Sequence, residues 1–405
     1  MRIKYKSPFK PKLIKNYFPK NLKIYTFNAG FKKKNLDLLV LVFDQIVSVA
    51  SVFSMTSTPS APIIWDKKNN KGFCKVLIVN SGNANAHTGL KGIEEIHKYS
   101  KVLKKIYKCK LSEILVSSTG VIGEKLNSKK IINKLSIIKS KSPRGILSAS
   151  KAIMTTDTFP KTCIQYVKYK SKKIRIFGFA KGSGMIAPNM GTMLAYIFIE
   201  ANLNRRHLTN LLKKNIDSTF NSISVDGDTS TSDTVMLFST GLNNVEKKLS
   251  KKNIKNISLG VSKVMSNLSR QIITDGEGIS KLIEVNVLKA RNKRQAYKVA
   301  FSVAESLLVK TAFAGGDANW GRIVAAIGKA DDNINQKKII IKFNNLILAK
   351  GGSSYSKINL RKINQYMKKK VIKIIIDLGL GKFTKKVLSS DLTHNYVRIN
   401  SDYRS

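Results

Sequence analysis

Hydrophobic residues recur along this chain with two different periods, which predict a mixture of helices and strands. In residues 89–107, apolar side chains return every three or four positions and lysines occupy the other face, as in an amphipathic helix. The same spacing predicts helices over residues 207–220, 254–272, 293–308 and 358–368.

Short apolar or alternating runs predict strands between these helices. We expect strands over residues 75–79, 114–116, 173–179, 192–199, 282–287, 337–343 and 371–376. The polar residues that follow the first two strands, 80–82 and 117–123, are expected to form a loop and a turn. Because helices and strands mix without strict alternation, the pattern predicts a layered α/β or α+β fold.

The segment 181–194 has the composition that a self-cleaving chain requires. Glycines and a proline precede Gly191, and Thr192 begins the expected apolar strand. If the bond between Gly191 and Thr192 breaks, the new α-amine of Thr192 can activate its own hydroxyl as a nucleophile. Gly191 has no side chain to hinder attack on its carbonyl, and glycine tolerates strained backbone angles. The alternative is a plain turn before a strand, the commoner role of a glycine-rich loop.

The longer stretch 177–195 resembles the cleavage segment of the ornithine acetyltransferase family, the glutamate N-acetyltransferases of arginine biosynthesis. Six further segments resemble the family in order and spacing: residues 80–86, 117–123, 154–158, 275–278, 315–322 and 398–405. The family usually has Ala where this chain has Gly191, and since both are small we expect cleavage to survive. The resemblance implies a two-lobed α-β-β-α sandwich with the active site between the lobes. It also implies an alpha chain of residues 1–191 and a beta chain of residues 192–405.

The resemblance further assigns roles in acyl transfer, which requires a nucleophile, a base and donors for the developing oxyanion. Thr192 would be the nucleophile, and Thr119 with Gly120 would form the oxyanion hole. For the last two residues, a strand-to-helix turn capped by Ser and Thr is the competing interpretation.

The implied substrates, N2-acetyl-L-ornithine and L-glutamate, both carry an α-carboxylate, and ornithine also carries a side-chain ammonium. Lys181 could bind the carboxylate, and Glu277 could bind the ammonium. The ordinary interpretation of Lys181 is a solvated lysine, and that of Glu277 is an exposed acidic residue in a turn. The remaining substrate-binding residues implied are Thr155, Thr156, Thr192, Asn400 and Ser405. Which of the two adjacent threonines binds substrate stays open. Asp226, Asp228, Asp317 and Arg322 are assigned only to structure.

The expected reaction is a double displacement in which the acetyl group passes through Thr192 to glutamate. No cofactor is expected, and no residue decides whether acetyl-CoA is a second donor. The family suggests a heterotetramer of two alpha and two beta chains. Two other functions remain as alternatives: a related self-processing aminopeptidase or hydrolase with an N-terminal nucleophile, and a non-enzymatic basic protein that binds nucleic acid.

A net charge of +49 at pH 7 is the strongest argument for nucleic-acid binding. The charge comes from 61 Lys and only 12 Arg, whereas recognition of bases and phosphates favours Arg. The lysines are spread over the whole chain beside Ile and Asn, so we interpret them as solvated positions and expect no specific nucleic acid partner.

Membrane and metal binding find no support in the sequence. No apolar run approaches the roughly 18–20 residues that span a bilayer, and the basic start leads into Pro8 and Pro11, so we expect a cytoplasmic protein. Cys74, Cys109 and Cys163 are distant from one another and odd in number, which predicts buried thiols. The four histidines show no ligand spacing, so no metal site is expected.

Overall fold

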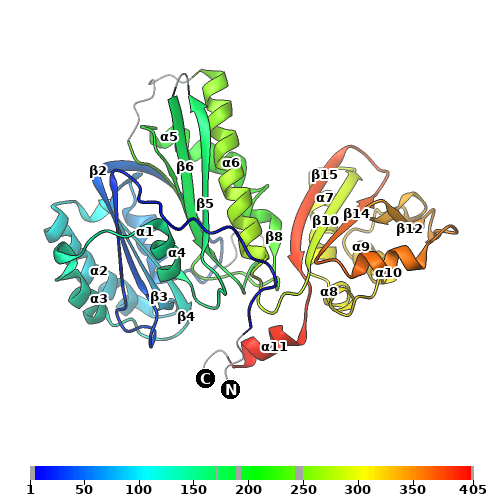
Figure 1. Cartoon of the computed structure of the whole chain (residues 1–405), viewed down its shortest axis with the longest axis horizontal. Coiled ribbons are helices and arrows are strands. Elements are labelled where there is room, and N and C mark those ends of the chain that lie inside the picture. Colours follow the sequence, from blue (N-terminus) through cyan, green and yellow to red (C-terminus); the bar gives the residue numbers. More distant parts are fainter. Residues whose placement is uncertain (1–4, 170–171, 188–192, 242–249, 403–405) are drawn as a thin grey trace.

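The computed structural model describes residues 5–169, 172–187, 193–241 and 250–402, which form two lobes (Figure 1). The larger lobe contains the chain up to α6 (Lys251–Ile273), and the smaller lobe begins at β10 (Leu282–Ala290). The last helix, α11 (His394–Ser401), follows the smaller lobe.

The larger lobe is built on one path of strands in the order β4-β3-β2-β9-β7-β6-β5, with β1 paired to β2. The strands are β1 (Leu22–Phe27), β2 (Leu38–Phe53), β3 (Phe73–Asn83), β4 (Ile114–Val121), β5 (Lys161–Tyr169), β6 (Lys172–Lys181), β7 (Leu194–Ile199) and β9 (Thr234–Ser239). The long strand β2 pairs with β3 through its first half and with β9 through its second half. It therefore passes from one layer of strands to the next.

Three apolar clusters show that these strands form an α-β-β-α sandwich. Aromatic side chains such as Phe43, Phe177 and Phe238 fill the space between the two strand layers. Outside the first layer lie α1 (Ala61–Asn69), α2 (Gly89–Tyr107) and α3 (Ser128–Leu135), whose apolar faces cover β2, β3 and β4. The predicted sandwich is thus confirmed, and it belongs to the larger lobe.

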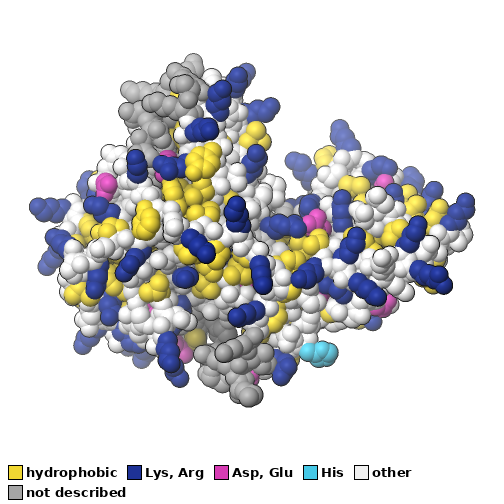
Figure 2. Space-filling view, in the orientation of Figure 1, with side chains coloured by type: hydrophobic (Ala, Val, Ile, Leu, Met, Phe, Trp, Pro, Cys, Tyr) yellow, Lys and Arg dark blue, Asp and Glu magenta, His cyan; other side chains and the backbone are white. Residues whose placement is uncertain are grey.

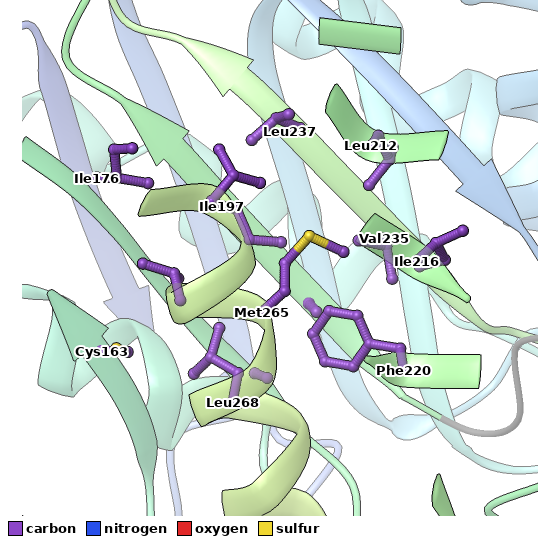
Figure 3. Close-up of a cluster of buried hydrophobic side chains, with 14 of the residues drawn as sticks. Cys163, Ile176, Ile197, Leu212, Ile216, Phe220, Val235, Leu237, Met265 and Leu268 are labelled. Carbon is purple, nitrogen blue, oxygen red and sulfur yellow. The ribbon is translucent and has the colours of Figure 1, made fainter. Parts of the chain in front are cut away.

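Outside the second layer lie α5 (Arg205–Ile216) and α6. Figure 3 shows Met265 and Leu268 of α6 among side chains such as Ile197 and Leu237, which come from β7 and β9. In this layer β7 lies between β9 and β6 and is paired with both strands. The lobe also contains α4 (Ile146–Ile153), which contacts β1 and β6.

The smaller lobe has its own sheet, in the order β13-β12-β11-β14-β10-β15-β8. Its strands are β8 (Ile223–Ser224), β10, β11 (Ile340–Phe343), β12 (Leu346–Lys350), β13 (Ser353–Ser354), β14 (Val371–Asp377) and β15 (Phe383–Ser390). Its helices are α7 (Lys293–Ala304), α8 (Leu307–Ala314), α9 (Trp320–Gly328) and α10 (Leu360–Met367). Because β8 precedes α6 in the chain, its pairing with β15 joins the two lobes.

Several predicted boundaries are wrong. Residues 80–82 and 117–121 are strand, because β3 and β4 pair in parallel from Val76 and Ile114 as far as Asn83 and Val121. The expected helix 293–308 is two helices, since Ser306 accepts the N–H of Val309 and caps α8. The helix expected over 207–220 ends at Ile216, and the strand expected from residue 337 begins at Ile340.

The three cysteines are buried, as expected. Within the described ranges, no helix combines the length and the apolar composition that crossing a bilayer requires.

Candidate active site

A cavity of about 270 Å³ opens at one end of the sandwich. It is lined by Ala84, Thr119, Gly120, Val121, Ile122, Thr155, Thr156, Lys181, Gly184, Met185, Ser230, Thr231, Ser232, Glu277 and Asn400. All seven of the predicted site residues that the structure describes are among them. The other three, Gly191, Thr192 and Ser405, lie outside the described residues. The cavity is formed between the sandwich and α11, the helix that follows the smaller lobe.

Thr119 and Gly120 reach the cavity because β4 continues into the predicted turn, as far as Val121. Gly120 has φ of +134°, and a Cβ atom there would lie 2.3 Å from the carbonyl carbon of Gly82 on β3. Only glycine allows this close approach of the two strands. The end of β4 is thereby fixed, with Thr119 buried beside the backbone of Gly120. A side-chain hydroxyl and a backbone N–H, the two kinds of donor that form oxyanion holes, are thus adjacent in the wall of the cavity.

Lys181 is the last residue of β6 and is only 3% exposed. Burial lowers the pKa of its ammonium group, while the nearby carboxylates of Asp157, Asp233 and Glu277 raise it. The interpretation of Lys181 as a solvated surface lysine is therefore wrong. A buried cation at the wall of a cavity is a favourable partner for an anionic group of a ligand.

Glu277 lies on the loop between α6 and β10, and it is 6% exposed rather than an exposed turn acid. Its backbone N–H donates to the carbonyl of Ser183, at 2.9 Å. The side-chain amide of Asn400 donates to Oε2, also at 2.9 Å. Burial raises the pKa of Glu277, and the hydrogen bonds from Thr156 and Asn400 oppose this shift. The carboxylate thus has one partner on α11 and one in the segment that precedes β5.

Gly184 leaves the space that the side chain of Glu277 occupies. A Cβ atom at this position would lie 2.3 Å from Oε2 of Glu277. The glycine-rich segment and the acidic residue therefore fit together only because residue 184 has no side chain. Thr155 and Thr156 both line the cavity, and the hydroxyl of Thr156 is the one bonded to Glu277.

A buried ion network supports the loops around the cavity, and the sequence reasoning missed it. The Lys161 ammonium contacts Oδ1 of Asp157 at 2.5 Å and Oδ2 of Asp275 at 2.6 Å, and all three side chains are fully buried. Asp157 also accepts the backbone N–H of Gly182, at 2.8 Å. Although burial opposes it, the charges of Lys161 and Lys181 hold the pKa of Asp157 at about 2.

The sequence contained a signal for the two acidic residues of this network, but not for its lysine. Asp157 and Asp275 belong to the motif-like segments 154–158 and 275–278, and acidic residues number only 24. Lys161, one lysine among 61, carried no signal because nothing in the sequence shows which lysine is buried.

Asp226 also fixes the glycine-rich segment, through the backbone of Met185 and Ile186. Its carboxylate accepts the backbone N–H groups of Met185 at 2.6 Å and Ile186 at 2.8 Å. The hydroxyl of Tyr396 on α11 donates to the same carboxylate, at 3.2 Å. The assignment of Asp226 to structure is in agreement with these bonds, which connect the segment before the predicted cleavage point to α11.

The residues after that point are anchored on β9. The backbone N–H of Met193 donates to Oδ1 of Asp233 at 2.5 Å, and the N–H of Thr234 donates to the carbonyl of Met193 at 3.1 Å. Met193 follows Thr192 in the chain. The last described residues before the predicted cleavage point and the first ones after it are therefore both fixed next to the cavity.

Comparison with known proteins shows similarity along nearly the whole chain. The ArgJ family model matches residues 23–405. The arginine biosynthesis bifunctional protein ArgJ of Bradyrhizobium diazoefficiens is 42% identical, over 98% of this chain and 99% of the relative. The ArgJ of Brucella suis biovar 1 is 40% identical, over 95% of each. A crystal structure of ArgJ from Bacillus halodurans is 37% identical, covers 52% of this chain and all of that chain, and has a TM-score of 0.49.

The match to the family model and the two relatives, together with the fold, identify an acyltransferase of arginine biosynthesis. The chain belongs to the ArgJ family.

Proposed function

We propose that this chain is a glutamate N-acetyltransferase that moves the acetyl group of N2-acetyl-L-ornithine to L-glutamate. The observation that carries the proposal is the presence of Lys181 and Glu277, two buried groups of opposite charge, on one small cavity. An amino acid with a charged side chain needs such a pair, since its carboxylate and its ammonium lose their water on binding.

The two substrates fit the two charges. Lys181 binds the α-carboxylate that both substrates share, and Glu277 binds the side-chain ammonium of acetylornithine. Asn400 and Thr156 hold the carboxylate of Glu277 in place. Thr155 and Ser405 complete the substrate contacts.

The nucleophile is made by self-cleavage between Gly191 and Thr192, which gives an alpha chain of residues 1–191 and a beta chain of residues 192–405. The α-amine of Thr192 then activates the Thr192 hydroxyl, which attacks the acetyl carbonyl. Thr119 and the backbone N–H of Gly120 stabilise the oxyanion. Ornithine leaves, and the amine of glutamate takes the acetyl group from the threonine ester.

The two alternative functions are not favoured. The lysines and arginines are spread over the face shown in Figure 2 and do not gather in one patch. The cavity contains a buried carboxylate, which repels a polyanion. A hydrolase would pass the acetyl group to water and release acetate. Adding glutamate would therefore change the products of the acetyltransferase but not those of the hydrolase.

The reaction needs no cofactor in this proposal. The relatives are called bifunctional, which supports a second donor, and acetyl-CoA is the candidate. Formation of acetylglutamate from acetyl-CoA, without acetylornithine, tests this donor. We further propose a cytoplasmic heterotetramer of two alpha and two beta chains, which light scattering of the purified protein tests.

The test of the main proposal uses acetylornithine labelled in its acetyl group. With glutamate present, we expect the label in acetylglutamate and a parallel-line, ping-pong pattern of initial rates. Label released as acetate at the same rate with and without glutamate would instead identify a hydrolase.

A further inference from the structure

The loop between β1 and β2, residues 28–37, has a fixed backbone, but the proposed function gives it no role. The carboxylate of Asp37 is buried and accepts the backbone N–H groups of residues 29–32, at distances from 2.5 to 3.0 Å. Hydrogen bonds to an ionised carboxylate are stronger than those between neutral groups. The four bonds therefore hold this β1–β2 loop in one conformation.

One side of the β1–β2 loop supports the proposed oxyanion hole. Gly82 of β3 has φ of +102°, and a Cβ atom there would lie 3.0 Å from the carbonyl oxygen of Phe31. Gly82 is also the residue that Gly120 approaches so closely that no Cβ atom fits between them. The loop, β3 and the end of β4 are thus packed backbone against backbone. A shift of the loop is therefore passed on to Gly120.

The side chain of Lys32 connects the same loop to another wall of the cavity. Its ammonium group donates to the carbonyl oxygen of Leu36, at 3.2 Å, and to that of Met154. Met154 follows α4 and directly precedes residues 155 and 156, two threonines that line the cavity. The second of them is bonded to Glu277. Lys32 therefore joins the support of the oxyanion hole to the substrate-binding segment.

The end of α4 is a favourable place for this positive charge. The last carbonyl groups of a helix have no partner within the helix, and the helix dipole there attracts a cation. The hydroxyl of Ser81 donates to the carbonyl of Ala152, at 2.7 Å, and Lys32 donates to that of Met154. The end of α4 is thus fixed both by β3 and by the β1–β2 loop.

The Lys32 ammonium also interacts with the charges around Lys181. It is half-buried, and burial lowers its pKa to about 8. The carboxylates of Asp37 and Asp157 oppose this shift, whereas the positive charge of Lys181 adds to it. Lys32 is therefore charged at neutral pH and becomes neutral as the pH rises through about 8. A neutral amine donates weaker hydrogen bonds than an ammonium group.

We propose that Lys32 is a positioning residue of the active site, which fixes Thr155 and Thr156 relative to the oxyanion hole. The inference deepens the proposed function and rests on it. Lys32 is not among the described residues that line the cavity, so it acts through the backbone of Met154 and does not touch the substrate. Acyl transfer requires the charged ends of a substrate and its acetyl carbonyl to be aligned together. A displacement of about 1 Å is enough to slow such a reaction about 100-fold.

Lys32→Met tests the proposal, because methionine keeps an unbranched apolar side chain but removes the ammonium group. We expect kcat/KM to fall about 10- to 100-fold for both acetylornithine and glutamate. Lys32→Arg keeps a charged donor and should retain more activity than Lys32→Met. Lys130→Met is the matched control, since Lys130 is exposed and donates to the carbonyl of Gly30 in the same loop, at 2.8 Å. It should leave both values of kcat/KM unchanged.

The pH profile distinguishes positioning from a loss of stability. In the wild type, kcat/KM should fall as the pH rises through about 8, because Lys32 loses its charge. Repulsion between two ammonium groups is mutual, so removal of Lys32 raises the pKa of Lys181. The alkaline fall should therefore lie at higher pH in Lys32→Met and at the wild-type pH in Lys130→Met. Partial unfolding would lower the activity without moving this midpoint.

Amide hydrogen exchange gives a second measurement, which does not depend on activity. Residues 154–156 should exchange faster in Lys32→Met and at the wild-type rate in Lys130→Met, while β7 stays unchanged in both. A folded Lys32→Met protein with wild-type kcat/KM, or with its alkaline fall at the wild-type pH, would overturn the role of Lys32 and leave the proposed function intact. A wild-type protein that transfers no acetyl group would refute the proposed function itself. Exchange at residues 154–156 would then still decide whether Lys32 fixes this segment.

Discussion

In the proposed function, the pair formed by Lys181 and Glu277 decides what the site can bind. Both side chains are buried on the same cavity, and the carboxylate of Glu277 is close enough to raise the pKa of Lys181. Specificity follows from this arrangement because a ligand that lacks a charge leaves one of the two buried groups without a partner.

Replacing Glu277 by Gln tests this claim. The amide keeps the shape and can keep the bond to Asn400, but it removes the charge that is proposed to bind the substrate ammonium. We expect kcat/KM for acetylornithine to fall about 10- to 100-fold, the value of a charged hydrogen bond. In the wild type, kcat/KM should rise with pH through the raised pKa of Glu277, because the ionised form binds the ammonium. The Gln variant should lose this rise. An unchanged pH profile would contradict the assignment.

Single residues also show what the sequence could reveal. The glycines at positions 120 and 184 could be recognised in the sequence as parts of motifs. The contacts that require a glycine at these positions could not be recognised. Gly120 approaches Gly82, 38 positions away, and Gly184 approaches Glu277. Those distances depend on strand pairing and loop packing, which periodicity does not encode. The burial of Lys181 and Glu277 was hidden for the same reason, since both residue types are usually exposed.

At the level of elements, α11 determines whether the cavity is complete. It contributes Asn400, and it is held by Tyr396 on Asp226 and by Gly278. Gly278 has φ of +72°, and a Cβ atom there would lie 2.4 Å from the backbone nitrogen of Tyr396. Terminal helices usually fray, so these contacts explain why this one is placed at the site.

The variant Gly278→Ala should displace α11 from the sandwich. The added Cβ both strains the backbone and collides with the helix, so we expect kcat/KM to fall at least about tenfold. Amide hydrogen exchange should become faster in α11 and stay unchanged in β7. Gly328→Ala is the control, because nothing lies within 4 Å of a Cβ there. Normal activity of Gly278→Ala would show that α11 is not needed.

Helices and strands with a clear hydrophobic periodicity could be predicted from the sequence. Those whose ends depend on contacts with other segments could not. The helix over residues 89–107 was found with its true ends, as α2 has a continuous apolar face and a polar one. The extension of β3 and β4 into polar residues was missed, because their mutual pairing, rather than hydrophobicity, keeps them extended. The break between α7 and α8 depends on one serine cap, which a run of apolar residues conceals.

At the scale of the whole molecule, the proposed cleavage would cut a chain whose two parts remain interleaved. β6 belongs to the alpha part and β7 to the beta part, yet the two strands pair along six residue positions. Lys161 and Asp157 lie in the alpha part, while Asp275 lies in the beta part. The buried ion network thus connects the two products.

We therefore expect the two fragments to co-elute in size-exclusion chromatography under native conditions and to separate only in denaturant. Lys161→Met should destabilise the assembly by about 3–5 kcal/mol, because it leaves two buried carboxylates unpaired. Lys98→Met, which removes an exposed lysine from its pair with Glu95, should leave the stability close to that of the wild type. Denaturant unfolding measures both. Equal effects of the two variants would contradict a structural role of the network.

The pH dependence of unfolding gives a second test of the network. The folded-state pKa of Asp157, about 2, lies below its ordinary value. Its contribution to stability is therefore present above about pH 4 and is lost as the pH falls towards 2. Lys161→Met should remove this acid-induced step, and a step that persists in the variant would show that Asp157 is not its source.

The most direct test of the account is the intact mass of the purified protein with and without acetylornithine. We predict two species that meet at Gly191 and Thr192, and a gain of one acetyl group on residue 192 of the second when acetylornithine is added without glutamate. Glutamate should remove that mass, and Thr192→Ala should stay uncleaved and unacetylated. A single species of 45.1 kDa, or acetylation at any other residue, would contradict the account.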